Sequence, residues 1–379
     1  MNAGGRIRGF DGLRGIAVSL VFLHHKTSLA AFDLGSYGVW LFFVLSGYLV
    51  VNILYRERVG IEEGRATWRS AFARFTLRRA LRIFPIYYAV LLLTVTPIGY
   101  FWSTYGPPGA LFNFAYLSNI WIGNILQSWP GPLSHLWSLS VEEQFYLIAA
   151  TGLLLCPSRK LPMVCLAVVG LALATKFGLE AAHAPAITVY TNSLINFGLI
   201  AYGGWCALLG NRMGSQERRG QRVSPGILLA YLALPLCFGL AGFAPDDRHL
   251  SQLAPALVGP LLLTIQLNQT QWLVRALEFG PLRWIGKRSY GIYLYHNLVT
   301  TAPVERVIGR LTGTNFSFSG WESFCVSLII TLLIAFASWR LIEQPLLRLR
   351  SPRSASRAPA MIGQGALGLP AGGASVGDD

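Results

Sequence analysis

Long apolar stretches recur along almost the whole chain, and they constrain its fold more than any other feature. Each is close to the ~20 residues that an α-helix needs to cross a bilayer. Only 13% of the 379 residues are charged, whereas soluble domains carry about 25%. The sequence therefore predicts an all-α, polytopic membrane bundle of about ten transmembrane helices. We place them roughly at 11–30, 37–55, 82–102, 136–156, 161–178, 189–209, 226–243, 251–268, 289–304 and 321–342.

Basic residues follow this ten-span pattern. One side of the predicted membrane receives most of the 31 Lys and Arg residues, and the connection 103–137 contains none. Because Lys and Arg accumulate on the cytoplasmic side of membrane proteins, we expect both termini to be cytoplasmic and residues 103–137 to lie outside. The same rule explains the net charge of +14 without a nucleic-acid partner. The basic residues on the outer side are Lys26, Lys176, Arg248, Arg306 and Arg310.

The remaining segments define the domain bounds, and the cysteines and histidines bear on metal binding. Residues 1–350 form the predicted membrane domain, and 351–379, rich in Ala, Gly, Ser and Pro, have the composition of a disordered cytoplasmic tail. The semi-apolar segment 111–127 is a candidate for a re-entrant or interfacial helix on the outer face, and the sequence leaves open whether it is re-entrant. The five Cys residues include no CxxC pair, and neither they nor the His pairs have metal-ligand spacing, so we expect no metal.

Arg14 and His25 lie in the first predicted span. Charged side chains are costly inside a membrane, so each needs a reason. The two are eleven residues apart, about three helical turns with a rise of ~16.5 Å, and so share one helix face. Arg14 as a positive-inside marker and His25 as a packing residue are the structural alternatives. His24 lies about 100° away and is interpreted as structural.

A stripe of arginines leads into the third span. Arg74, Arg78 and Arg82 have i, i+4, i+8 spacing, with Arg79 beside them. Such residues share one helix face. They either contact lipid headgroups or bind a ligand with several phosphates, because Arg offers forked donors to phosphate oxygens.

Further ionisable residues occur in later spans. Glu142 and Glu143 lie one or two turns into the span 136–156 from its outer end, and we expect at most one of them to face the interior. His25 and Glu142 are then at matched depth in the outer half of the bilayer. His296 and Glu343 are either packing residues or functional ones, and the sequence leaves both interpretations open.

Six blocks, in order, resemble those of the acyltransferase-3 family of integral membrane acyltransferases over roughly residues 6–347. Trp40, in the second block, departs from a position that is commonly polar in the family. The blocks are FDGLRGIAVSLVFLHH (an Arg, ten residues, then His), GSYGVWLFFVLSGYL, RFTLRRALRIFPIYY, HLWSLSVEEQFYL, SYGIYLYH and the closing EQP.

The resemblance implies a ten-helix transferase in the bacterial cytoplasmic (inner) membrane. Such a protein moves an acyl group, commonly acetyl, from cytoplasmic acyl-CoA to a hydroxyl of an extracytoplasmic acceptor, often a sugar. By position, Arg14 and His25 are its functional pair, Arg78 and Arg79 belong to its acyl-CoA-side motif, and Glu142 to its acidic block. Some members carry an SGNH hydrolase-like domain, which we do not expect here.

The chemistry of acyl transfer fits these residues. Transfer to an alcohol needs a base, and His is the side chain best matched to neutral pH. We expect His25 to act as the base, with an acyl-His intermediate as a variant, and Glu142 to orient or assist it. Arg14 and the four arginines of the stripe, Arg74, Arg78, Arg79 and Arg82, are expected to hold the CoA phosphates.

Two other functions stay open at this point. A transporter or flippase for a lipid-linked glycan also needs several spans and buried charges. However, the sequence has no inverted-repeat signal, and the arginine stripe is one-sided. A non-catalytic partner in envelope synthesis is a weaker alternative. The sequence names neither the acceptor nor the acyl chain.

Overall fold

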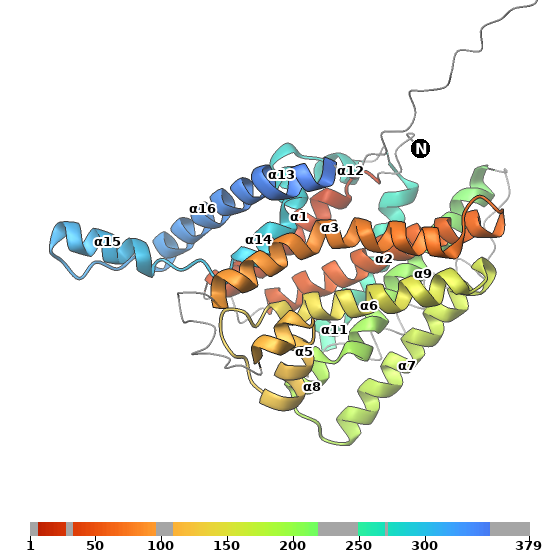
Figure 1. The fold of residues 1–379 in the computed structure, drawn as a ribbon, viewed down its shortest axis with the longest axis horizontal. Helices are drawn as coiled ribbons and strands as arrows, with labels where there is room; N and C mark the ends of the chain where they lie inside the picture. Colours follow the sequence, from red (N-terminus) through yellow and green to blue (C-terminus); the bar gives the residue numbers. More distant parts are fainter. Residues whose placement is uncertain (1–6, 28–32, 96–108, 219–248, 270–271, 349–379) are drawn as a thin grey trace, which may run out of the picture.

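The predicted all-α class is confirmed. The structure is a computed structural model that describes residues 7–27, 33–95, 109–218, 249–269 and 272–348. Every regular element in this part of the chain is helical, as Figure 1 shows. Four helical stretches are long and apolar enough to cross a membrane: Leu34–Glu62, Ser158–Ala181, Ser193–Gly214 and Gly320–Arg348.

The helix α2 occupies the centre of the bundle. It packs against α1, α3, α6, α9 and α11, and the side chains of Phe43, Val44 and Tyr48 are almost fully buried. In Figure 1, α2, α3, α6 and α9 run roughly side by side, with α7 inclined against them. The bounds of these helices are α1 Phe10–Lys26, α2 Leu34–Glu62, α3 Trp68–Val95, α6 Leu136–Leu155, α7 Leu161–Ala181, α9 Ser193–Arg218 and α11 His249–Leu267.

Two glycines allow α2 and α9 to approach each other closely. A Cβ atom added at Gly47 in α2 would overlap the carbonyl oxygen of Ile200 in α9. In the opposite direction, a Cβ added at Gly203 would overlap the carbonyl oxygen of Val44. Small residues permit such close backbone approach between membrane helices. The backbones of α2 and α9 are therefore interlocked at two levels.

The ninth predicted span, 289–304, is not one helix. The chain forms α13 (Gly280–Lys287), then α14 (Ser289–Tyr295), and helical structure resumes only with α15 (Ala302–Thr312). The break between α13 and α14 falls at Arg288, whose backbone leaves the helical region at φ −106° and ψ 6°. The seventh predicted span, 226–243, and the predicted tail lie outside the described residues. The count of ten spans and the orientation of the termini remain predictions.

The segment 111–127 forms short helical turns rather than a spanning helix. Residues 109–114 are helical, and α5 (Ser118–Ile120) continues into a π-helical turn, η2 (Trp121–Leu126). Asn119 donates a hydrogen bond from Nδ2 to the carbonyl oxygen of Thr191, 3.1 Å away. The turns therefore pack against α6 and α8 (Ala186–Thr191).

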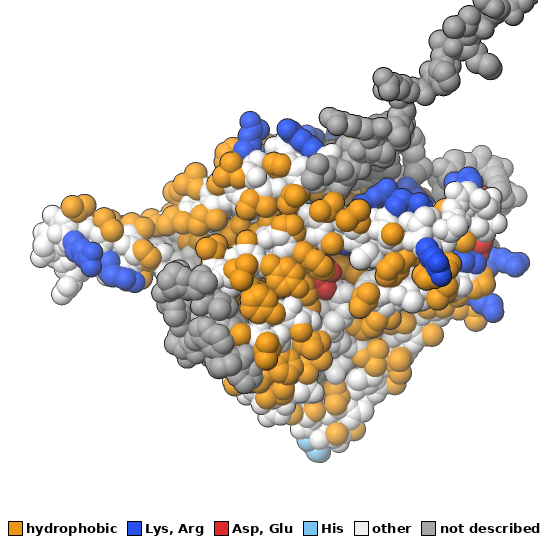
Figure 2. All heavy atoms as spheres, in the orientation of Figure 1, with side chains coloured by type: hydrophobic (Ala, Val, Ile, Leu, Met, Phe, Trp, Pro, Cys, Tyr) orange, Lys and Arg blue, Asp and Glu red, His pale blue; other side chains and the backbone are white. Residues whose placement is uncertain are grey.

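Side chains of different types separate over the surface. Apolar side chains cover much of the face in Figure 2, while Lys and Arg gather mainly near its border, over the ends of helices. A second basic group lies on α15, which projects from the bundle beyond α16 (Gly320–Ser338). An apolar belt with basic borders is typical of membrane helices.

Candidate active site

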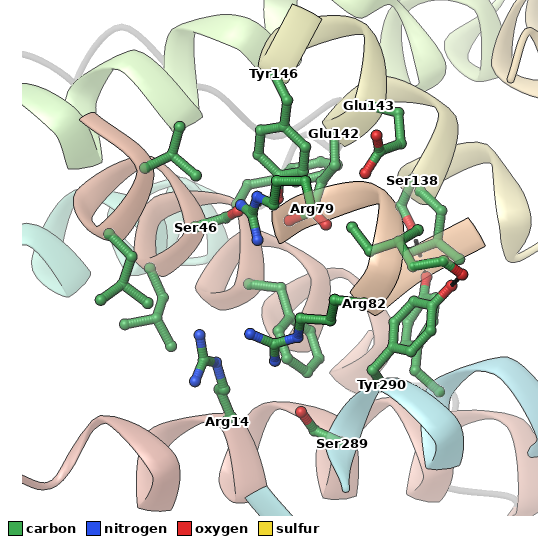
Figure 3. A pocket seen from close by; sticks show the side chains of 18 of the residues that line it. Arg14, Ser46, Arg79, Arg82, Ser138, Glu142, Glu143, Tyr146, Ser289 and Tyr290 are labelled. Atoms are coloured by element: carbon green, nitrogen blue, oxygen red, sulfur yellow. Dashed lines mark hydrogen bonds between the residues drawn. The ribbon is translucent and has the colours of Figure 1, made fainter. Parts of the chain in front are cut away.

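A cavity of about 300 Å³ lies between α1, α2, α3, α6 and α14. Its polar lining comes from helices that are far apart in the sequence, and Figure 3 shows these side chains converging on one space. Most of the lining is apolar, but several charged side chains reach it. They are the arginines Arg14, Arg78, Arg79 and Arg82 and the carboxylates Glu57, Glu142 and Glu143.

The arginine stripe on α3 divides between two environments. Arg78, Arg79 and Arg82 line the cavity, as their predicted common face requires. Arg74, the first residue of the stripe, does not line it. Its guanidinium instead forms an ion pair with Glu57 of α2, at an N–O distance of 2.6 Å. The structure thus brings three of the four predicted α3 arginines together with Arg14.

Both carboxylates of α6 line the cavity, so the expectation that at most one would face the interior is wrong. The α6 residues on the cavity are Ser138, Leu139, Glu142, Glu143 and Tyr146. This i, i+1, i+4, i+5, i+8 pattern is a stripe two residues wide. The cavity therefore extends far enough around α6 to take in side chains that diverge by about 100°.

Glu142 is at the centre of the polar contacts. Its carboxylate hydrogen-bonds with the hydroxyls of Ser46 and Tyr146 and interacts electrostatically with Arg79 and Arg14. Ser46 and Tyr146 are also hydrogen-bonded to each other. The guanidinium of Arg79 lies over the Tyr146 ring, with 3.9 Å between its central carbon and the ring centroid. Arg14 is held at its other side by Asp11, at 3.3 Å.

His25 lies outside this cavity, at the other end of α1. Its Nδ1 is 3.0 Å from the carbonyl oxygen of Val21, and its side chain is exposed. The centroid of its ring is 5.0 Å from that of His296, which in turn is 4.9 Å from that of His135. The predicted pair Arg14 and His25 is therefore split between two sites, which we call the arginine cavity and the histidine cluster (His25, His135 and His296).

The expected matched depth of His25 and Glu142 is wrong. The histidine cluster draws on His135, which immediately precedes α6. Glu142 lies seven residues further along, about 10.5 Å of helical rise, and interacts with Arg14 instead. The predicted start of the span 136–156 agrees with the start of α6 at Leu136. The sequence could not show the axial offset between α1 and α6.

Tyr293 and Ser138 form the wall between the two sites. Both line the arginine cavity, and their hydroxyl oxygens are 2.5 Å apart. The Tyr293 hydroxyl also donates to the carbonyl oxygen of His135, at 3.1 Å. Its ring centroid is 5.6 Å from that of His296. A single layer of side chains thus separates the arginines from the histidines.

Several of these residues were missed by the sequence-based assignment of the site. Tyr146 and His135 both belong to the block that contains Glu142, and Tyr146 follows Glu142 by four residues, on the same helix face. That spacing was a usable signal. Ser46 and Tyr293 carried no comparable signal. In the described part of the chain, no three His, Cys, Asp or Glu side chains are grouped as metal ligands.

Comparison with known proteins gives a match over most of the chain. A family model described as an acyltransferase domain matches residues 7–340. The peptidoglycan O-acetyltransferase OatA of Listeria monocytogenes serovar 1/2a is 30% identical over 90% of this chain and 56% of its own length. The putative peptidoglycan O-acetyltransferase YrhL of Bacillus subtilis is 29% identical over 93% and 56%.

A third relative, the O-acetyltransferase OatA of Staphylococcus aureus, is 24% identical over 89% of this chain and 57% of its own length. The chain therefore spans a little over half the length of these relatives. No solved structure matches it.

Proposed function

This chain belongs to the acyltransferase-3 family, and from that premise we propose that it is an integral membrane O-acyltransferase. In this proposal it moves an acyl group from cytoplasmic acyl-CoA to a hydroxyl of an extracytoplasmic or membrane-linked carbohydrate. Acetyl-CoA is the proposed donor, since the relatives are named O-acetyltransferases. The protein is proposed to cross the cytoplasmic membrane several times, with both termini inside.

The observation that carries the proposal is the arginine cavity. Four arginines line it together with three carboxylates, those of Glu57, Glu142 and Glu143. Positive charge is therefore in excess, and an excess charge among apolar helices is costly unless an anion is bound. The Nε of Arg79 is buried and has no hydrogen-bond partner among the described residues. A donor in this position fits a phosphate oxygen, which Arg binds through forked hydrogen bonds. We assign the CoA phosphates to Arg14, Arg78, Arg79 and Arg82.

The position of His25 fits the other end of the same donor. Its rise from Arg14 along α1 is ~16.5 Å, so phosphates at the arginines leave the pantetheine arm to extend toward the histidine cluster. The arm would have to pass the wall that Tyr293 and Ser138 form. The exposed ring of His25 is open to an acceptor that arrives from the outer side.

The proposed reaction uses His25 as the base. Because the Val21 carbonyl only accepts hydrogen bonds, Nδ1 of His25 carries its proton, and Nε2 keeps the lone pair. Nε2 takes the proton of the acceptor hydroxyl while the hydroxyl oxygen attacks the acyl carbonyl carbon. The tetrahedral intermediate then breaks its C–S bond, the proton passes from His25 to the sulfur, and CoA leaves as the free thiol. In this scheme Glu142 does not touch His25 but holds Arg14 and Arg79 in the arginine cavity.

The acceptor is proposed to be a carbohydrate, and peptidoglycan is the first to test because two relatives are named for it. The protein in lipid nanodiscs would be given acetyl-CoA labelled in the acetyl group, with and without soluble peptidoglycan fragments. We expect release of free CoA thiol that depends on the fragments, with label appearing on them. Label that stays on CoA with every glycan acceptor tried would contradict acyl transfer and favour a transporter.

A further inference from the structure

Lys26 places a positive charge beside the proposed base. It is the last residue of α1, directly after His25, and its side chain is half-buried. Its ammonium interacts electrostatically with all three rings of the histidine cluster: His25, His135 and His296. The charge is therefore directed at this cluster.

The contacts of Lys26 distinguish it from a lysine that reaches for lipid headgroups. A lysine near a membrane surface usually extends its ammonium outward to the interface. Here Nζ instead donates to the carbonyl oxygen of Val299, 2.7 Å away, in the segment that follows α14. The bond holds the ammonium against the chain that carries His296.

The charge of Lys26 is not neutralised within the described structure. Among the described residues, no Asp or Glu forms an ion pair with Lys26. One of the three protons on Nζ is used by Val299, so two remain for other acceptors. A half-buried cation that lacks a counterion is costly, which indicates that an anion belongs there during function.

The other two rings of the histidine cluster have no N–H group free to donate to an oxyanion. Both ring nitrogens of His135 are occupied by carbonyl oxygens, those of Pro132 at 2.9 Å and Leu294 at 3.2 Å. The Nδ1 of His296 is held by the carbonyl oxygen of Tyr293, at 2.6 Å, and its Nε2 has no partner among the described residues. With Nδ1 donating, that Nε2 is an acceptor and repels a developing oxyanion.

We propose that Lys26 is a catalytic residue whose ammonium stabilises the oxyanion of the tetrahedral intermediate. This inference rests on the proposed function, in which His25 activates the acceptor hydroxyl. When the hydroxyl oxygen bonds to the acyl carbon, the carbonyl π electrons move to the acyl oxygen. The Nζ of Lys26 donates to that oxygen. The charge returns to the C=O bond as the C–S bond breaks, and Lys26 stays protonated throughout.

Three substitutions separate this role from a purely structural one. Lys26→Gln keeps N–H groups for the Val299 carbonyl and removes the charge. Lys26→Arg keeps both, and Lys26→Met removes both. Removing a donor to an oxyanion typically lowers kcat by about 10²–10³-fold. We expect that loss in Lys26→Met, most of it in Lys26→Gln, and substantial recovery in Lys26→Arg.

The measurement is kcat and the KM for acetyl-CoA in nanodiscs, with equal amounts of each variant. KM should stay near the wild-type value, because Lys26 is remote from the arginine cavity. Lys160 is an exposed lysine immediately before α7. Lys160→Met is therefore the matched control and should keep full activity. Lys26→Gln as active as Lys26→Arg would overturn the proposal and leave Lys26 as a tether to Val299.

A further variant distinguishes failure of this inference from failure of the proposed function. His25→Ala should be inactive whatever Lys26 does. If His25→Ala is inactive and Lys26→Met is fully active, only the role of Lys26 is wrong. If His25→Ala retains full acyl transfer, the proposed base is wrong, and the assignment of Lys26 is wrong with it.

Discussion

The guanidinium of Arg79 lies over the ring of Tyr146, with 3.9 Å between its central carbon and the ring centroid. A guanidinium held by a cation–π contact can still donate hydrogen bonds from its N–H groups to phosphate oxygens. The hydroxyl of Tyr146 is fixed by Ser46, so the aromatic face is itself held in place. Arg79 is therefore oriented before any ligand arrives.

The first prediction concerns the binding of acetyl-CoA by Arg78 and Arg79. If Arg78 and Arg79 hold CoA phosphates, replacing either with Ala should raise the KM for acetyl-CoA, by about tenfold for each 1.4 kcal/mol of binding free energy that the substitution removes. Arg79→Lys should recover only part of the affinity, because an ammonium has neither the fork nor the flat face. Initial rates over a range of acetyl-CoA concentrations measure both effects.

Arg69→Ala is the control for the arginine series. Arg69 lies on the same helix, but its side chain is exposed and outside the arginine cavity. Its removal should leave KM unchanged. An unchanged KM for Arg78→Ala and Arg79→Ala, at normal protein levels, would mean that these arginines contact lipid headgroups and do not bind CoA.

The second prediction compares two adjacent histidines. A general base typically contributes 10²–10⁴-fold to rate, so His25→Ala should abolish detectable acylation while the protein still accumulates in the membrane. His24→Ala should cost far less. The His24 ring contacts that of His25, at 5.1 Å between centroids, but it packs against Gly35 of α2 and lies about 100° around the helix from the face that carries Arg14 and His25. Label transfer from acetyl-CoA measures both variants.

Because the two changes remove an imidazole at nearly the same depth, general damage to the fold should appear in both. An essential His24 with a dispensable His25 would show that the wrong face of α1 has been assigned. If neither substitution affected the function of the protein, a transporter would become the better-supported function.

The third prediction concerns the packing of α2 on α9. A methyl group at Gly47 would overlap the Ile200 carbonyl, and overpacking of this kind costs typically 1–3 kcal/mol. Gly47→Ala should therefore lower the midpoint of thermal unfolding in detergent and the yield of folded protein. Gly170→Ala on α7, where an added Cβ meets nothing within 4 Å, should not. Equal midpoints for the two variants would mean that α2 and α9 are not interlocked.

The fourth prediction is the orientation in the membrane. In a variant without its five cysteines, a Cys at Ser128 should react with a membrane-impermeant maleimide from outside, and a Cys at Arg65 should not. Both positions are exposed, whereas Gly109, in the same outer connection as Ser128, is buried and unsuitable. The reverse labelling pattern would overturn the cytoplasmic placement of the acyl-CoA site.

Local spacing predicted the parts of the site that one helix determines. Arg78 and Arg82 are four residues apart, so the helical repeat alone puts them on one face, and both line the cavity. The same spacing included Arg74, which the structure assigns to Glu57 instead. That partner lies on α2, and its position relative to α3 depends on tertiary packing that no local pattern encodes.

The relative positions of different helices could not be predicted from the sequence for the same reason. The depth of Glu142 relative to His25 depends on the axial offset between α1 and α6. Hydrophobicity determines such offsets only to within a turn or two, which is the size of the error made. His296 was noticed as an ionisable residue, but its packing against His25 depends on tertiary structure: it directly follows α14, which ends at Tyr295 inside the ninth predicted span.

The interlocked backbones of α2 and α9 also limit how the protein handles its two substrates. Gly47 and Gly203 place each backbone against a carbonyl of the other helix, so this pair cannot slide or rock without first separating. Alternating access at this helix pair would require such motion. The acyl group would therefore cross through a fixed partition by movement of side chains such as Tyr293. Coenzyme and sugar would each stay on their own side, and the membrane would remain sealed to ions during turnover.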